Sequence, residues 1–146
     1  MNKPDQNIIN EIAQELDCGN ECYFNQKTKE LICLPNADLM ETAGEDYYKE
    51  MFQDDFKKIE SQKKDLIKFE VLESFESFKI MEDFKNQIES DEFEEKLDKA
   101  LKRSKPFQNF KNLIDNSEYR EQWFQFKQKE IEKIVINTIE RKNAGI

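Results

Sequence analysis

The residues best suited to binding chemistry lie in the last third of the chain, where cations alternate with aromatic rings. Lysine and arginine neutralise phosphates, and exposed rings stack on bases or anchor a protein partner. The candidate binding residues are Arg103, Lys105, Phe107, Phe110, Lys111, Trp123, Phe126 and Lys127. The same rings recur at helical spacing, which is typical of a core. In a mixed arrangement, Phe124 packs inside while Trp123 or Phe126 stays partly exposed as an anchor for a protein partner.

Charge divides the chain into an acidic body and a mildly basic end. The whole chain has 23 basic and 32 acidic residues and a formal net charge of −9. Met1 to Lys102 holds 14 basic against 26 acidic residues, whereas Arg103 to Ile146 holds 9 against 6. An acidic chain repels a phosphate backbone unless its positive charge is gathered in one place. We therefore expect a protein partner, with nucleic acid bound by the basic end as the alternative.

The chain contains no histidine, which removes the usual general base, the Ser-His and Cys-His nucleophile systems and the commonest zinc ligand. Its three glycines are solitary, so no glycine-rich phosphate loop is present. We therefore expect no enzymatic activity and no cofactor. A carboxylate- and metal-dependent enzyme is the remaining catalytic alternative.

Carboxylates are the one reactive group in abundance. Asp91, Glu94, Glu95 and Asp98 are spaced to line one face of a helix, where they could hold a hard cation such as magnesium. Charge runs on amphipathic helices are ordinarily solvated faces, and we adopt that interpretation.

The three cysteines are Cys18, Cys22 and Cys33, and their spacing superficially resembles part of a metal knuckle. Zinc would need a carboxylate such as Asp17 or Glu21 as its fourth ligand. We interpret Cys22 and Cys33 as structural thiols in strands, because cysteine packs there as a small hydrophobe. A redox role for Cys18 is the alternative.

The chain is expected to be a cytoplasmic protein. An odd number of cysteines and no apolar signal segment in Met1 to Asn10 fit a reducing compartment. The longest apolar run, Leu31 to Leu34, is far too short to span a bilayer.

The elements that must position these residues are predicted to form one α+β domain over residues 1–146. Residues 1–72 should hold a helix stopped by Gly19, a hairpin, a second helix and a third strand over Leu66 to Leu72. The hairpin strands are predicted over Glu21 to Asn25 and Glu30 to Leu34. A small antiparallel sheet of about three strands should therefore be packed by about five or six helices.

Residues 73–146 are predicted to be helical throughout. Ser74 and Ser90 are expected to cap helices, Pro106 to start a short helix, and Ser117 to start the longest, ending near Asn143. The predicted buried face of the longest helix is Phe124, Ile131, Val135 and Ile139.

Several segments together resemble the uncharacterised protein family 0158 of bacteria. They are Glu73 to Phe84, then Ala100-Leu101 followed by Pro106 to Lys111, and finally Trp123 to Lys127. The resemblance extends from Tyr23-Phe24-Asn25 in the hairpin to the final helix.

The resemblance implies a bacterial cytoplasmic protein and brings no activity, cofactor or catalytic residue. One departure is Ser104-Lys105-Pro106, where similar sequences tend to carry glycine and a small residue before the aromatic. The positions that match the family pattern are Phe75, Phe78, Phe107, Phe110, Trp123 and Phe126.

Overall fold

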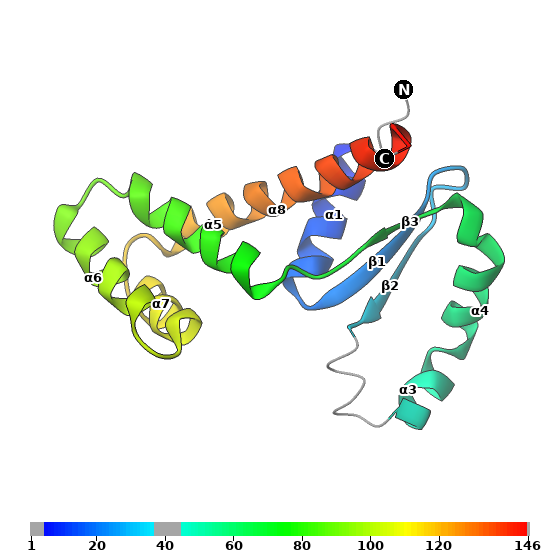
Figure 1. The fold of residues 1–146 in the computed structure, drawn as a ribbon, viewed down its shortest axis with the longest axis horizontal. Coiled ribbons are helices and arrows are strands. Elements are labelled where there is room, and N and C mark those ends of the chain that lie inside the picture. The colour runs from blue at the N-terminus through cyan, green and yellow to red at the C-terminus, as the bar shows by residue number, and fades with distance from the viewer. Residues whose placement is uncertain (1–4, 37–44, 146) are drawn as a thin grey trace. The chain divides into compact units, whose positions relative to one another are not determined.

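The computed structural model describes residues 5–36 and 45–145, drawn as a coloured ribbon in Figure 1. Gly44, one of the three solitary glycines, lies outside the described residues. The chain forms two compact units. One, the sheet unit, comprises Met1–Val71 and Ile131–Ile146, and the other, the helical unit, is Leu72–Glu130. The last helix therefore supplies its first half to the helical unit and its second half to the sheet unit.

The described residues contain seven α-helices and a three-stranded antiparallel sheet, which confirms the predicted α+β class. The strands are β1 (Asn20–Asn25), β2 (Leu31–Pro35) and β3 (Leu66–Phe69). The helices are α1 (Gln6–Asp17), α3 (Glu45–Met51), α4 (Gln53–Gln62), α5 (Ser74–Gln87), α6 (Asp91–Lys102), α7 (Pro106–Asp115) and α8 (Arg120–Asn143). The helix expected after the hairpin is divided at Phe52 into α3 and α4, which accounts for the larger number.

The first helix begins and ends as its sequence predicts. The side chain of Asp5 caps α1 by accepting from the backbone N–H of Ile8 at 2.9 Å. Gly19 follows the helix with a φ of +92°, in the left-handed region that glycine enters without a steric cost. The apolar face is buried apart from the half-buried Ile8, with Ile12 and Ala13 both inaccessible to solvent. Gln6 also donates to Glu132 at 3.1 Å, which links α1 to the second half of α8.

The sheet has the order β2-β1-β3, with the predicted hairpin as its first two strands. Cys22 lies opposite Cys33 in β2 and opposite Phe69 in β3. The third strand ends at Phe69, earlier than the alternation to Leu72 predicts, and its pairing with β1 runs from Asn25–Leu66 to Cys22–Phe69.

The short helices after the hairpin contribute polar contacts to the strands. Tyr48 of α3 donates its hydroxyl to the carbonyl oxygen of Pro35 at 2.7 Å. Pro35 ends an edge strand, where its missing N–H costs no ladder hydrogen bond.

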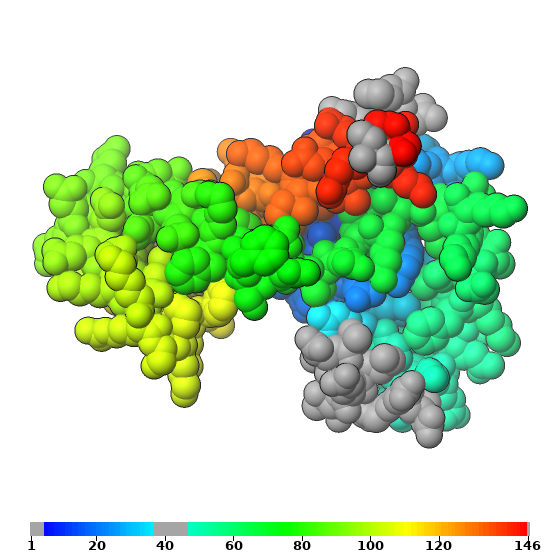
Figure 2. Space-filling view, viewed as in Figure 1, coloured from blue at the N-terminus to red at the C-terminus, as the bar shows by residue number. Residues whose placement is uncertain are grey.

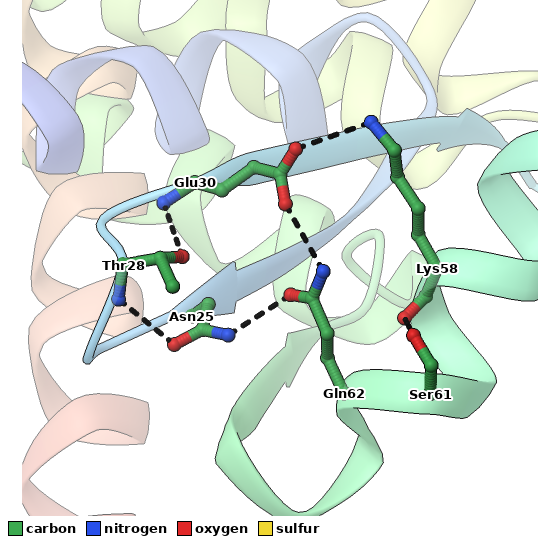
Figure 3. A network of polar contacts seen from close by, with 6 residues as sticks. All are labelled: Asn25, Thr28, Glu30, Lys58, Ser61 and Gln62. Atoms are coloured by element: carbon green, nitrogen blue, oxygen red, sulfur yellow. Dashed lines mark hydrogen bonds and ion pairs between the residues drawn. The ribbon is translucent and has the colours of Figure 1, made fainter.

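A chain of side-chain hydrogen bonds ties the hairpin end to α4 (Figure 3). Asn25, 2 % exposed, donates to Gln62 at 2.9 Å, and Gln62 donates to Glu30 at 3.2 Å. Lys58 completes the network with an ion pair to Glu30 at 3.3 Å. Hydrogen bonds from Gln62 and Lys58 lower the pKa of the Glu30 carboxyl.

The helical unit has one cap that was predicted and one that was not. Ser90 caps α6 by accepting from the N–H of Phe93 at 3.2 Å. Ser74, expected to be a cap, is instead the first residue of α5, and Glu73 is the N-cap. Glu73 forms a reciprocal capping box with Glu76, whose carboxylate accepts from the Glu73 N–H at 3.0 Å. A glutamate with this partner three residues later replaces the usual serine.

Aromatic rings form the centre of the helical unit. The Trp123 ring lies 5.3 Å from Phe84 and 4.9 Å from Phe110, both in edge-to-face geometry. The prediction that Phe124 packs inside is therefore wrong, and of the two rings expected to be partly exposed, Phe126 is half-buried whereas Trp123 is buried. Trp123 is 8 % exposed, whereas Phe124 is 40 % exposed with the Arg120 guanidinium 4.7 Å from its ring centre. Adjacent helical residues point about 100° apart, so only one of these two rings can face Phe84 and Phe110.

Candidate functional site

The helical unit carries a cleft of about 310 Å³ between α6 and α7. We call it the basic cleft. Its lining residues are Lys96, Lys99, Ala100, Arg103, Asn109, Asn112 and Leu113. Figure 2 shows side chains of α6 in yellow-green and of α7 in yellow at the surface of this unit.

Lys96 and Lys99 of α6, with Arg103 at its C-cap, form one side of the basic cleft. Lys96, Lys99 and Arg103 are spaced by three and seven residues, which places them along one helical stripe. All three are exposed. The opposite side of α6 is anchored by Leu97 and Leu101, which are buried in the core of the unit. The amphipathic pattern of α6 therefore fixes the direction of the cationic stripe.

The α7 side of the basic cleft is held in place by Asn109. Its amide nitrogen donates to the carbonyl oxygen of Ala100 at 3.3 Å and to that of Ser104 at 2.9 Å. Between the two helices, Lys105 adopts a left-handed φ of +56° immediately before Pro106. A non-glycine residue in that conformation is uncommon. Ser104-Lys105-Pro106 thus forms the turn that joins the two sides of the cleft.

The charges around the basic cleft are unequally compensated. Lys99 pairs with Glu95 at 3.2 Å, with both side chains about two-thirds exposed, so water weakens this pair. Lys96 and Arg103 make no side-chain ion pair with another residue that the structure describes. From Lys96 to Asn112 the sequence holds six cations and only Asp98 as an acid. A local excess of positive charge therefore lies on a chain whose net charge is −9.

Asp98 pairs with two lysines that do not line the cleft, and it does not itself line the cleft. It accepts from Lys85 of α5 at 2.9 Å and from Lys102 at 2.7 Å. Hydrogen bonds from Lys102 and Lys85 lower the pKa of the Asp98 carboxyl, and the bond with Asp98 raises the pKa of Lys102. This ion-pair triad fastens α5 to α6.

The four predicted cations have different positions in the helical unit. Arg103 lines the basic cleft. Lys105 and Lys111 are exposed in the following turn and on α7, outside the cleft lining. Lys127 lies above two rings of its own helix, 5.6 Å from Trp123 and 5.5 Å from Phe124.

The four predicted aromatic residues are divided between core and surface. Phe110 and Trp123 are buried, at 1 % and 8 % exposure. Phe126 is half-buried, with its ring 5.4 Å from Phe84. Phe107 is 41 % exposed and is the ring of this set that is available to a partner.

Sequence reasoning missed Lys96, Lys99, Asn109 and Asn112, which line the cleft with Arg103. The signal was the spacing of three and seven residues between cations on the predicted helix. It was overlooked because these lysines alternate with acids, and because the division of charge at Arg103 assigned them to the acidic body. The two asparagines have no charge or ring to draw attention.

The other candidate groups are placed as follows. Within residues 5–36 and 45–145, no three acidic or cysteine side chains converge to hold a metal ion. Cys22 and Cys33 face each other across β1 and β2, with their sulfur atoms 3.5 Å apart, and Cys18 is exposed at the end of α1. Of the helices described, none combines the length and the apolar character that a membrane crossing requires.

Comparison with protein families found that the model of the uncharacterised protein family UPF0158 matches residues 5–144. Comparisons with curated proteins and with solved structures found no match. The match covers both units and the whole of the basic cleft.

Proposed function

The chain belongs to the uncharacterised protein family UPF0158, and we propose that it is a non-enzymatic interaction domain that binds an acidic segment of a partner protein in the basic cleft. The single observation that carries the proposal is the stripe of Lys96, Lys99 and Arg103 along one wall of that cleft. The chemistry that fits this stripe is a short run of carboxylates.

The composition of the basic cleft favours a peptide with both acidic and apolar side chains. Lys96 and Arg103 offer charged donors, and hydrogen bonds to carboxylates from such donors are stronger than neutral ones. Leu113, half-buried, adds apolar surface to the lining, whereas Ala100 is 6 % exposed and adds little. A leucine or similar side chain of the partner would lose water against Leu113 while its neighbouring carboxylates pair with the cations.

The dimensions of the cationic stripe favour a protein segment over nucleic acid. Seven residues of helix span about 10 Å, which is enough for a few carboxylates. A nucleic-acid interface is typically larger and continues along the backbone. Before Lys96, a continuing phosphate backbone would meet the adjacent Glu95 and, one turn earlier, Glu92, both exposed. Repulsion there limits the length of polyanion that the stripe can hold.

The side chains of the basic cleft favour binding over proton transfer. Lysine and arginine keep their protons at neutral pH, and asparagine does not titrate. The cleft lining therefore contains no group suited to act as a general base near neutrality. This supports an interaction domain over an enzyme.

A partner carboxylate can replace Glu95 as the ion-pair partner of Lys99. Because both side chains are mostly exposed, their pairing contributes little and can be exchanged at low cost. A partner carboxylate would take the place of Glu95 beside Lys99 while Glu95 turns to water.

The test is fluorescence anisotropy of a labelled short peptide made of glutamate and leucine, titrated with the full chain. Binding is expected with the wild type, to weaken roughly tenfold in the variant K96E/R103E, and to fall with added salt. Variant K111E is the matched control, because Lys111 is exposed on α7 outside the cleft. It should bind nearly as the wild type does.

Three outcomes would contradict the proposal. One is equal loss in K111E and K96E/R103E, which would show unspecific charge attraction. Another is unchanged binding when glutamine replaces every glutamate of the peptide. The third is tighter binding of single-stranded RNA than of the peptide, which would identify the cleft as a nucleic-acid site. Circular dichroism of each variant should match that of the wild type.

A further inference from the structure

The hairpin of the sheet unit brings two cysteines directly opposite each other. Cys22 of β1 pairs in register with Cys33 of β2, and their sulfur atoms are 3.5 Å apart. Two thiols this close can react to form a disulfide. Neither cysteine lines the basic cleft.

The hydrogen-bond register sets the backbone distance at this pair. The N–H of Asn25 donates to Glu30 at 2.9 Å, and the N–H of Asn36 donates to Gly19 at 3.2 Å. Bonded pairs alternate along an antiparallel ladder, so the two cysteines occupy a non-hydrogen-bonded pair. Such pairs have α-carbons about 4.5 Å apart, at the short end of the range that a disulfide bridges. The strands need little movement to accommodate the bond.

The two thiols differ in their access to solvent. Cys33 is half-exposed, whereas Cys22 is completely buried. The hydrogen bond with Cys33 and burial both raise the pKa of the Cys22 thiol. Cys33 is therefore the sulfur that a small oxidant reaches first, and Cys22 is the neighbour that completes the reaction.

We propose that Cys22 and Cys33 are an oxidation site, which a hydroperoxide converts into a disulfide between the central strand and the edge strand. Cys33 attacks the peroxide, its sulfur is oxidised to a sulfenic acid, and the peroxide is reduced, releasing water or an alcohol. The Cys22 sulfur then displaces hydroxide from the sulfenic acid, and with the Cys22 proton this leaves as water. Two hydrogen atoms are lost from the protein, and a dithiol restores them.

The bond would fasten β2 to β1 covalently at the middle of their pairing. The edge strand would then stay paired with the sheet under conditions that separate the reduced hairpin. This inference is independent of the proposed function, because Cys22 and Cys33 lie in the sheet unit and the basic cleft lies in the helical unit.

The test uses the full-length variant C18S, which removes the exposed thiol that could otherwise form intermolecular disulfides. The protein is treated with hydrogen peroxide, alkylated and digested with trypsin without reduction. Trypsin cleaves after Lys27 and Lys29, so the two cysteines fall on separate peptides. We expect a joined peptide about 2 Da lighter than the sum of its parts, which dithiothreitol separates.

The control is C18S/C33S, which should yield no joined peptide and should leave Cys22 in the reduced form. The inference is overturned if peroxide leaves both cysteines of folded C18S alkylatable. It is equally overturned if Cys33 gains oxygen atoms up to the sulfinic acid without joining Cys22. Far-ultraviolet circular dichroism before and after treatment establishes that the oxidised protein is folded.

Discussion

The amide of Asn109 donates to the backbone carbonyl of Ala100 at 3.3 Å, so a residue of α7 is fastened to the last turn of α6. The same amide also donates to Ser104 in the turn between the helices. The Ala100 carbonyl lies in the last turn of α6, where backbone acceptors lack the hydrogen bond from a residue four positions later. A single side chain therefore holds together the two walls of the basic cleft.

Replacing Asn109 by alanine should loosen the α6–α7 turn. Loss of its two hydrogen bonds is expected to lower the free energy of unfolding by about 1 to 2 kcal/mol, measured by urea denaturation. Binding of the acidic peptide should weaken as well, because the two walls lose their fixed spacing. Q108A is the matched control, since the adjacent Gln108 is exposed and lies outside the cleft. Equal effects in both variants would contradict the role given to Asn109.

Replacing Trp123 by alanine should destabilise the protein strongly, because its ring packs between Phe84 and Phe110. Removing a buried aromatic side chain costs about 3 to 5 kcal/mol. F124A is the comparison, because Phe124 is 40 % exposed and makes exposed cation–π contacts with Arg120 and Lys127, so its loss should cost less than about 1 kcal/mol. Urea denaturation of the two variants measures the difference. A larger loss of unfolding free energy in F124A than in W123A would contradict the placement of Trp123 in the core and Phe124 at the surface.

Replacing Asn25 by aspartate should remove the hydrogen-bond donor that the hairpin network needs at this position. Gln62 accepts from Asn25 through its oxygen and donates to Glu30 through its nitrogen. An ionised aspartate cannot donate, and turning the Gln62 amide would direct its oxygen at Glu30. We expect a loss of about 1 to 3 kcal/mol at neutral pH.

Urea denaturation of N25D and wild type at neutral pH measures the loss. Equal midpoints of the two proteins would contradict the donor role given to Asn25.

Asp98 should contribute stability that depends on pH. Its folded-state pKa is lowered by Lys102 and Lys85, so its contribution is complete above the unfolded pKa of about 3.9. It is lost as pH falls through the lower folded-state pKa. Thermal melting temperatures should thus show D98N below wild type at neutral pH, with the gap closing in acid. A gap that widens on acidification would be inconsistent with the triad.

Much of the fold could be predicted because local chemistry decides it. The helix stop at Gly19, the hairpin and the cap at Ser90 each depend on residues close together in the sequence. The Trp123 and Phe124 error has a different origin. Both rings fit an apolar stripe on α8, and the choice between them depends on Phe84 and Phe110, which are distant in sequence.

The basic cleft could be predicted only in part. Arg103 attracted attention through the change in charge along the chain, but its neighbours on the cleft wall lie seven and four residues earlier among acids. Asn109 and Asn112 complete the site only because a left-handed Lys105 returns α7 against α6. No pattern of charge or hydrophobicity predicts that backbone conformation at a lysine.

The central claim is that the cleft between α6 and α7 receives an acidic segment. Its most direct test is a two-dimensional ¹H–¹⁵N NMR titration of the full chain with the glutamate–leucine peptide. We predict that the amide signals of Lys96, Ala100, Arg103 and Asn112 shift progressively, and that the shifts disappear in K96E/R103E. Shifts confined to the sheet unit, or unchanged in the variant, would contradict it.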